Sequence, residues 1–309
     1  MSLRIIYGRA GSGKSTYCLN EIKESLNQGN NTRHIIIVPE QFSLQAEKKL
    51  IKAVGASGIN GAEVLSFRRL SHRVLGEVGG LVRKHINPAG KSILVYTIME
   101  KLRDDLRVFA KAAGKQGFVN TLCGTISELK RYNIAPSALG SIETASLSPQ
   151  LADKLHDIGL IYGEFEKRLH DKYIDSDDDL DILAEKLELY KAFETSEIWL
   201  DEFSGFTPQE YGVIAKLMSK AVRVNVLLCT DCLSEDYAPE DTDPFLPASA
   251  AAAKLIRLAK DSGIKVDAPV SLKNNGFKFN KELAFLESNF YSYLHGKYKE
   301  STRHYSLGL

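Results

Sequence analysis

Short apolar runs alternate with amphipathic stretches along the first 70 residues. Three runs rich in Ile, Val and Leu are predicted strands: residues 3–7, 34–38 and 63–67. Two stretches between them carry apolar side chains at helical spacing and are predicted helices: residues 16–26 and 41–54. The second run is apolar enough for a strand buried on both faces, so this alternation predicts a doubly wound parallel sheet.

The pattern changes between residues 71 and 190. Apolar positions there recur at helical spacing, and we predict no strand over about 120 residues, a length far beyond an ordinary connection. The expected helices are residues 92–106, 119–132, 151–169 and 180–190. The pattern predicts an inserted helical subdomain, 71–190, between two segments of one α/β domain, 1–70 and 191–309.

Strand and helix patterns resume after the insertion. Residues 197–203, 222–229 and, at an edge, 266–272 are predicted strands. Two predicted helices begin at capping residues, one at Thr207 before Pro208 and one at Ser249. A last helix is expected at residues 283–294, with aromatic side chains that favour core packing over base stacking: Phe285, Phe290, Tyr291 and Tyr293.

Composition excludes several classes of protein. The chain has 309 residues, 44% of them hydrophobic, and 40 basic against 39 acidic residues give a net charge of +1. Such a chain holds a real core, and its overall charge does not indicate nucleic acid, so any DNA contact must come from local patches. No apolar run approaches the ~20 residues of a membrane helix, which predicts a soluble, cytoplasmic protein with no membrane contact.

The four cysteines do not form a metal-binding pattern. They are Cys18, Cys123, Cys229 and Cys232. The last two form a C-x-x-C pair, but without a second pair or a nearby histidine we interpret it as the end of a strand. We expect free thiols.

The segment between the first strand and the first helix carries the strongest functional signal. Residues 8–15 match the phosphate-binding pattern G-x-x-x-x-G-K-S/T: Gly8, Arg9, Ala10, Gly11, Ser12, Gly13, Lys14 and Ser15. The glycines let backbone N–H groups face a phosphate chain at a helix N-terminus. Lys14 would neutralise the β- and γ-phosphates of ATP, and Ser15 would bind Mg²⁺. The sequence therefore predicts a P-loop nucleotide site at the end of the first strand of the parallel sheet.

Two carboxylates end the predicted strand at residues 197–203. In a Mg²⁺–nucleotide site the neighbouring strand supplies one acid for the metal and one for the attacking water. We assign these roles to Asp201 and Glu202, respectively. The next strand ends in Thr230 and Asp231, which either sense the γ-phosphate or only open the following loop. An EF-hand at residues 175–186 is rejected because Leu180 and Lys186 stand where Gly and Glu are needed, so we interpret these acids as helix caps.

The ordered motifs resemble those of superfamily 1 helicases of the UvrD/RecB type. Besides the P-loop and the two acids, they include residues 38–41, reading Val-Pro-Glu-Gln, and residues 65–70, reading Leu-Ser-Phe-Arg-Arg-Leu. Together with residues 206–210, Phe-Thr-Pro-Gln-Glu, they are similar to the N-terminal part of the AddB family, the second subunits of bacterial AddAB helicase-nucleases. The resemblance covers essentially the whole chain and implies a P-loop NTPase fold with a RecA-like parallel sheet.

This resemblance implies a role in DNA end resection for double-strand break repair by homologous recombination. It implies an AddA-type partner subunit, single-stranded DNA and duplex ends as ligands, and a DNA path near Ser66, Phe67 and Arg68. A second motor domain and a nuclease domain with an iron–sulfur cluster would lie beyond Leu309, since residues 304–309 lack the cap or polar tail that usually ends a domain. Other basic residues, Arg69, Arg73 and the run 83–85, either contact phosphates or form solvated helix faces.

The chain departs from the helicase pattern in three places. No glutamine precedes Gly8 to read adenine, Ser204 and Gly205 replace the usual Gln-Asp pair, and no sensor glutamine stands near residues 233–234. The two departures after Phe203 favour an alternative: a catalytically inactive helicase-like scaffold that binds single-stranded DNA and recognises a regulatory sequence. A small-molecule kinase is disfavoured by the long helical insertion.

Overall fold

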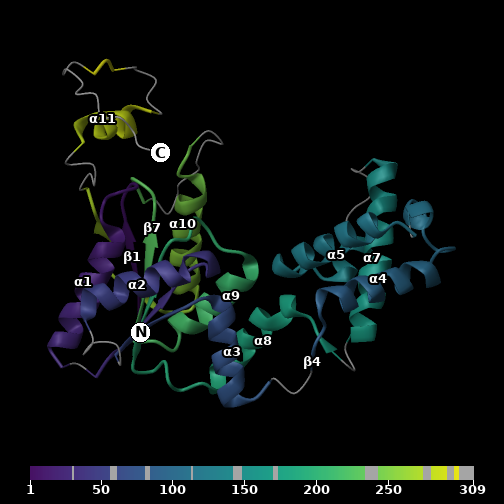
Figure 1. The fold of residues 1–309 in the computed structure, drawn as a ribbon, viewed down its shortest axis with the longest axis horizontal. Coiled ribbons are helices and arrows are strands. Elements are labelled where there is room, and N and C mark those ends of the chain that lie inside the picture. The colour runs from purple at the N-terminus through teal and green to yellow at the C-terminus, as the bar shows by residue number, and fades with distance from the viewer. Residues whose placement is uncertain are drawn as a thin grey trace. The chain divides into compact units, whose positions relative to one another are not determined.

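The computed structural model describes most of the chain (Figure 1). The described residues are 1–29, 31–55, 61–80, 84–112, 114–141, 148–169, 173–233, 243–273, 280–290 and 296–298. The predicted residues Arg83, Ser234, Tyr291, Tyr293 and 304–309 lie outside them. Within this part of the chain, no helix is both long and apolar enough to span a bilayer.

The chain divides into two compact units. The sheet unit comprises Met1–Val64, Thr195–Gly205 and Ala221–Leu309, and the helical unit comprises Leu65–Glu194 and Phe206–Lys220. The sequence placed the boundaries after residues 70 and 190 and did not separate the segment from Phe206 to Lys220. The identity of these parts as a RecA-like domain and an inserted subdomain stays a prediction.

A mostly parallel sheet is the centre of the sheet unit. Among the described residues it has seven strands in the order β3-β2-β6-β7-β1-β8, with β9 also paired to β1. Their bounds are β1 Ser2–Tyr7, β2 Arg33–Ile37, β3 Ala62–Leu65, β6 Ser196–Leu200, β7 Arg223–Leu228, β8 Lys265–Val266 and β9 Val270–Ser271. The pairs β2–β6, β6–β7 and β7–β1 are parallel, which confirms the predicted fold class.

The register of these strands determines which residues meet at the end of the sheet. Ile37 is paired with Leu200, and Tyr7 is paired with Leu228. Because the strands run in one direction, the residues that follow them meet at one edge of the sheet. The loop after β1 and the acids after β6 therefore share that edge.

Helices cover the sheet. They are α1 Lys14–Asn27, the 3-10 turn η1 Glu40–Phe42, α2 Ser43–Val54 and α10 Leu246–Asp261. A further helix of this unit, α11 Lys281–Asn289, has no buried residue. Figure 1 shows α1 on one side of β1 and β7 and α10 on the other. The core below α1 and α2 includes Ile6, Ile22, Ile36, Leu50 and Trp199. The sheet is therefore apolar on the face that these helices bury.

The helical unit contains the remaining elements. Its helices and turns are α3 Phe67–Val78, α4 Pro88–Lys101, η3 Phe109–Ala112, α5 Gln116–Arg131, α6 Pro136–Gly140, α7 Pro149–Leu169, η5 Ser176–Asp178, α8 Asp179–Lys186, η6 Leu187–Leu189 and α9 Pro208–Met218. Residues from α4, α5 and α7 form its core, including Ile98, Ile126 and Phe165, each fully buried. Thr207 caps α9 in a capping box with Glu210, as predicted.

Several local predictions were wrong. The stretch 71–190 contains a two-stranded parallel sheet, β4 Lys84–His85 with β5 Tyr173–Ile174. Strands of only two residues are too short to leave a periodic signal in the sequence. Ser249 lies inside α10 and is buried, because that helix begins three residues earlier. Phe290 is 64% exposed, so it does not pack in the core.

The acidic run at residues 175–181 has a second role besides capping. Asp175 caps η5, but no side-chain bond of Asp178 caps α8. Lys91 Nζ instead binds Asp175 at 2.6 Å and Asp177 at 2.8 Å, and Lys130 Nζ binds Asp178 at 2.7 Å. Burial alone would lower the pKa of Lys130, but its acidic partners raise that pKa above its ordinary value. The run is thus one half of a largely buried ionic cluster.

Another carboxylate, Asp157 of α7, organises a loop of the helical unit. It is fully buried and accepts hydrogen bonds from the N–H groups of Arg107, Val108 and Phe109 at 2.9, 2.8 and 2.9 Å. Burial alone would raise its pKa, but these backbone donors outweigh burial and hold the pKa below its ordinary value. The ionised carboxylate therefore stabilises the fold.

We expect Asp157→Ala to lower the free energy of unfolding by about 1–3 kcal/mol, because three backbone N–H groups lose the buried carboxylate that accepts their hydrogen bonds. Urea unfolding followed by circular dichroism measures this. The folded pKa lies below the unfolded value of 3.8, so the contribution is fully present above about pH 4 and is lost as pH falls through the folded pKa. Asp153→Ala removes an exposed carboxylate from the same helix and is the control. Equal losses in the two variants would contradict this role.

Candidate nucleotide site

The loop between β1 and α1 has the backbone that its glycines permit. Gly11 and Gly13 have φ of 73° and 90°, in the left-handed region that favours glycine. A Cβ atom on Gly8 would lie 2.5 Å from the Leu272 carbonyl oxygen and from Ser12 Oγ, so the chain passes too closely for a side chain. Glycine is thus needed at position 13 for its left-handed backbone, and at position 8 because Leu272 and Ser12 lie too close for a side chain.

The start of α1 is open to an anion. Gly13 makes no side-chain cap, and the first turn of α1 contains no acidic residue. Lys14 Nζ donates hydrogen bonds to the carbonyl oxygens of Gly8 at 2.7 Å and Arg9 at 3.0 Å. Ser12 Oγ is buried without a hydrogen-bond partner among the described residues. A helix N-terminus, an ammonium group and an unpaired hydroxyl on one loop fit a phosphate chain.

The Arg9 side chain contacts residues that do not line the predicted phosphate site. Its guanidinium pairs with Asp231 at 3.2 Å and Glu287 at 3.3 Å, and it lies 5.3 Å from the centre of the Phe245 ring. In the phosphate-binding pattern only the backbone is needed at this position and at Ala10. We therefore regard the Arg9 side chain as a structural contact of the loop.

Asp201 and Glu202 follow β6 at the same edge. Asp201 is 9% exposed and lies near the Ser15 hydroxyl. Burial, joined by the charge of Glu202, raises the pKa of Asp201, although the nearby Ser15 hydroxyl opposes this. A hydroxyl and a buried carboxylate are hard oxygen donors that suit Mg²⁺, so these two residues fit the predicted metal site.

Glu202 has an unusual backbone. Its φ is 65°, and its N–H donates to Asp201 Oδ1 at 2.8 Å. A non-glycine residue in this region is strained, and such strain concentrates at functional sites. The side chain is 38% exposed, so water can reach the carboxylate.

A cavity of about 540 Å³ joins the loop to the acids. Its lining includes Gly11, Gly13, Lys14 and Ser15 on one side and Asp201, Glu202, Phe203 and Ser204 on the other. The volume lies within the range of small-molecule sites. The structure thus brings together the predicted phosphate, metal and water-activating residues around one space.

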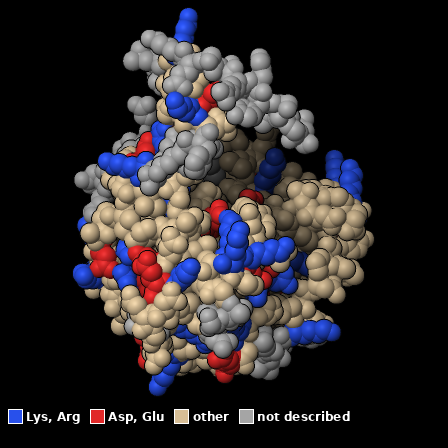
Figure 2. All heavy atoms as spheres, turned by 60° about the vertical axis from the view of Figure 1, so that its left-hand side comes forward, with Lys and Arg blue, Asp and Glu red and all other residues tan. Residues whose placement is uncertain are grey.

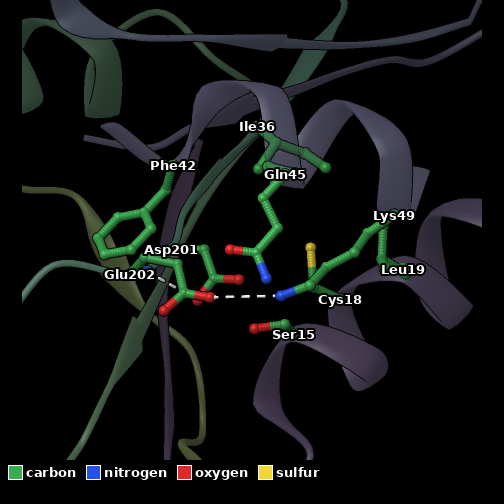
Figure 3. A pocket seen from close by; sticks show the side chains of 10 residues that line it. Ser15, Cys18, Leu19, Ile36, Phe42, Gln45, Lys49, Asp201 and Glu202 are labelled. Atoms are coloured by element: carbon green, nitrogen blue, oxygen red, sulfur yellow. Dashed lines mark hydrogen bonds and ion pairs between the residues drawn. The ribbon is translucent and has the colours of Figure 1, made fainter. Parts of the chain in front are cut away.

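Two residues beside this site were missed by sequence reasoning. Gln45 and Lys49 extend from α2 toward Asp201 and Glu202, and Ser15 lies opposite them (Figure 3). They line a smaller cavity of about 20 Å³ with Ser15, Asp201 and Glu202. Lys49 Nζ lies 3.7 Å from Glu202 Oε1. Phe42 lines the same cavity, and Gln45 and Lys49 follow it by three and seven residues. This helical spacing is the sequence signal that could have placed the three side chains on one face.

The contacts of Thr230 and Asp231, which follow β7, favour the alternative in which these residues only open the following loop. Thr230 is fully buried, and its hydroxyl contacts Ser249 Oγ at 2.9 Å and the Cys232 carbonyl at 2.9 Å. The Asp231 carboxylate pairs with Arg9. Both side chains thus have contacts that hold the loop around them.

The residues expected near DNA lie in the helical unit. Ser66 caps α3 by accepting the Arg69 N–H at 3.2 Å, Phe67 begins that helix and is buried, and Arg68 is exposed. The predicted strand 63–67 therefore ends earlier, at Leu65. Basic and acidic side chains of the described residues are interspersed on the face drawn in Figure 2. Surfaces of this kind carry no long-range field of one sign.

Comparison with known proteins relates the whole constellation to one family. A family model described as "ADDB, N-terminal" matches residues 5–287. The chain is 47% identical, over 98% of its length, to an ATP-dependent helicase/deoxyribonuclease subunit of Clostridium botulinum, and 45% identical, over 99% of its length, to that of Ruminiclostridium cellulolyticum. It spans 27% of each relative, about a quarter of their length.

Both comparisons cover the P-loop, the acids after β6 and the helical unit together. A match to more than half of the chain, supported by identities of this size, agrees with the motif order found in the sequence. The chain belongs to the AddB N-terminal family.

Proposed function

We propose that this chain is the ATP–Mg²⁺-binding region of a helicase-nuclease subunit. The observation that carries the proposal is that Ser15 of the loop and the buried Asp201 of the strand end line the same cavity. They are the two oxygen donors that a Mg²⁺–nucleotide site requires. The relatives, which are named as subunits of an ATP-dependent helicase/deoxyribonuclease, support the same function.

Each residue of the site has a distinct role in this proposal. The backbone of residues 8–15 binds the phosphates, Lys14 neutralises them, and Ser15 with Asp201 would hold Mg²⁺. When bound, Mg²⁺ supplies positive charge that stabilises the phosphoryl group during transfer. Glu202, exposed and next to Asp201, orients the attacking water and accepts its proton. Lys14 leaves its carbonyl partners, Gly8 and Arg9, to reach a phosphate.

The wider assignment follows from the family. We infer that the protein acts in the cytoplasm with an AddA-type subunit on duplex ends and single-stranded DNA, in end resection for homologous recombination. Ser66, Phe67 and Arg68 are proposed to lie near the DNA, with exposed Arg68 the residue best able to reach a phosphate. An iron–sulfur cluster belongs to a nuclease region outside this chain.

A second candidate function is a scaffold that binds single-stranded DNA without hydrolysing ATP. It is favoured by Ser204 and Gly205, which replace the Gln-Asp pair after Phe203 and so lack its amide and carboxylate. The intact loop and acids favour nucleotide binding in either case. Coupling between nucleotide and DNA therefore distinguishes the two functions.

Lys14→Ala should weaken binding of a fluorescent ATP analogue in Mg²⁺ by about ten- to a hundredfold, because a charged contact to phosphate is lost. Fluorescence titration measures the Kd. Lys23→Ala removes an exposed lysine from the same helix and should leave the Kd within about twofold of the original. Unchanged affinity in the Lys14 variant would argue against the loop as the site.

Asp201→Asn should remove most of the Mg²⁺ dependence of nucleotide affinity, because a neutral amide replaces the anionic donor. The measurement is the ratio of Kd values in EDTA and in Mg²⁺. Glu202→Gln should keep the original ratio, since Glu202 is assigned to water and not to the metal. An Asp201 variant with an unchanged ratio would exclude Asp201 from the metal site.

ATP and Mg²⁺ should change the Kd for a single-stranded oligonucleotide by about twofold or more if nucleotide and DNA binding are coupled. Fluorescence anisotropy with and without nucleotide measures the change, and Lys14→Ala should abolish it. Nucleotide binding that leaves the DNA affinity unchanged would favour the scaffold.

A further inference from the structure

The ion pair between Lys49 and Glu202 is the starting observation. Lys49 Nζ lies 3.7 Å from Glu202 Oε1, and the two side chains are 44% and 38% exposed. Figure 3 shows the lysine extending from α2 to the carboxylate. This contact joins α2 to the residue assigned to activate water.

Glu202 lies between two cavities, and Lys49 lines only one of them. Glu202 lines both the large cavity of the phosphate loop and the small cavity below α2. Lys49 lines the small cavity and is not among the lining residues of the large one. The ammonium group therefore attracts the carboxylate toward α2 and away from the space where phosphates would bind.

The backbone of Glu202 is held in place, so only its side chain can move. Its N–H is bonded to Asp201 Oδ1, and its φ of 65° is fixed by the turn after β6. A change of carboxylate position must come from side-chain torsions, which change at small energetic cost. The ion pair acts directly on those torsions because it binds the end of the side chain.

We propose that Lys49 is a positioning residue that restrains Glu202 outside the nucleotide space and so limits water activation until the pair opens. The proposal rests on the proposed function, because it assigns Glu202 as the base. Exposed ion pairs are weak, and a nucleotide's negative charge competes with Glu202 for the ammonium group. A pair of this strength suits a restraint that opens and closes.

Gln45 supports this assignment of α2. It precedes Lys49 by one helical turn and lines the same small cavity beside Asp201 and Glu202. The cavity volume of about 20 Å³ is enough for one water molecule. Gln45 and Lys49 thus place two polar side chains of α2 beside the restrained carboxylate, in a cavity also lined by apolar side chains such as Leu19 and Ile36.

The test compares the affinity for ADP with aluminium fluoride, which mimics the phosphoryl group in transfer, with the affinity for ADP alone. This ratio does not require turnover. Lys49→Ala should raise the relative affinity for the aluminium fluoride complex by about two- to fivefold, the range for release of an exposed ion pair. Where hydrolysis is measurable, kcat should rise by a similar factor with little change in KM.

Matched variants isolate the contact. Lys48→Ala removes an exposed lysine from the neighbouring position of α2 and should leave the ratio unchanged, and Lys49→Arg, which keeps the pair, should do the same. In a Glu202→Gln background, Lys49→Ala should give no gain, because the restrained carboxylate is gone.

Three results would overturn the proposal: an unchanged ratio, a lower ratio, or an equal gain in the Glu202→Gln background. A lower ratio would mean that Lys49 supports the productive position of Glu202. If neither ADP nor ATP binds the original chain, the proposed function fails, and the restraint fails with it. If nucleotide binds normally and the ratio does not respond, only the restraint fails.

Discussion

The common direction of the central strands is the constraint on which the site depends. Because β1, β7 and β6 are parallel, a loop after residue 7 and acids after residue 200 meet at one edge, although about 190 residues separate them. An antiparallel arrangement of β6 would send Asp201 to the opposite edge. The strand register therefore contributes as much to the candidate site as the glycine loop does.

In the helical unit the main constraint is the burial of charged side chains. Lys91 and Lys130 would be costly to bury alone, and each faces several carboxylates from the run at residues 175–178. Such a network tolerates burial only when its members are paired, so it constrains how α4 and α5 approach the segment before α8. The acidic run thus fixes the packing of helices that are distant in sequence.

Much of the fold could be predicted from the sequence because its signals are local. Periodicity identified α5 and α7 within a few residues, and the spacing of glycines identified the loop before Lys14. The wrong predictions have two physical causes. The two-residue strands β4 and β5 and the exposure of Phe290 depend on tertiary contacts, which leave no periodic signal in the sequence. The start of α10 has a local signal, Pro247 in its first turn, which the prediction did not use.

The candidate site divides in the same way. Lys14, Ser15, Asp201 and Glu202 belong to motifs, and their chemistry could be assigned from the order and spacing of those motifs alone. Lys49 belongs to no motif, and only the packing of α2 brings it within 3.7 Å of Glu202. Its charge alone predicts a solvated helix face.

The backbone of Glu202 supports its assignment independently of any motif. A non-glycine residue with φ of 65° costs roughly 1–2 kcal/mol, and an exposed pair with Lys49 offsets at most about 1 kcal/mol of it. Glycine at this position would relax the backbone, and the hydrogen bond to Asp201 needs only a main-chain N–H, which glycine also provides. Neither the turn nor its hydrogen bond requires a side chain here. What glycine lacks is the carboxylate, so stability alone does not account for Glu202, and this supports the role in activating water that is proposed for it.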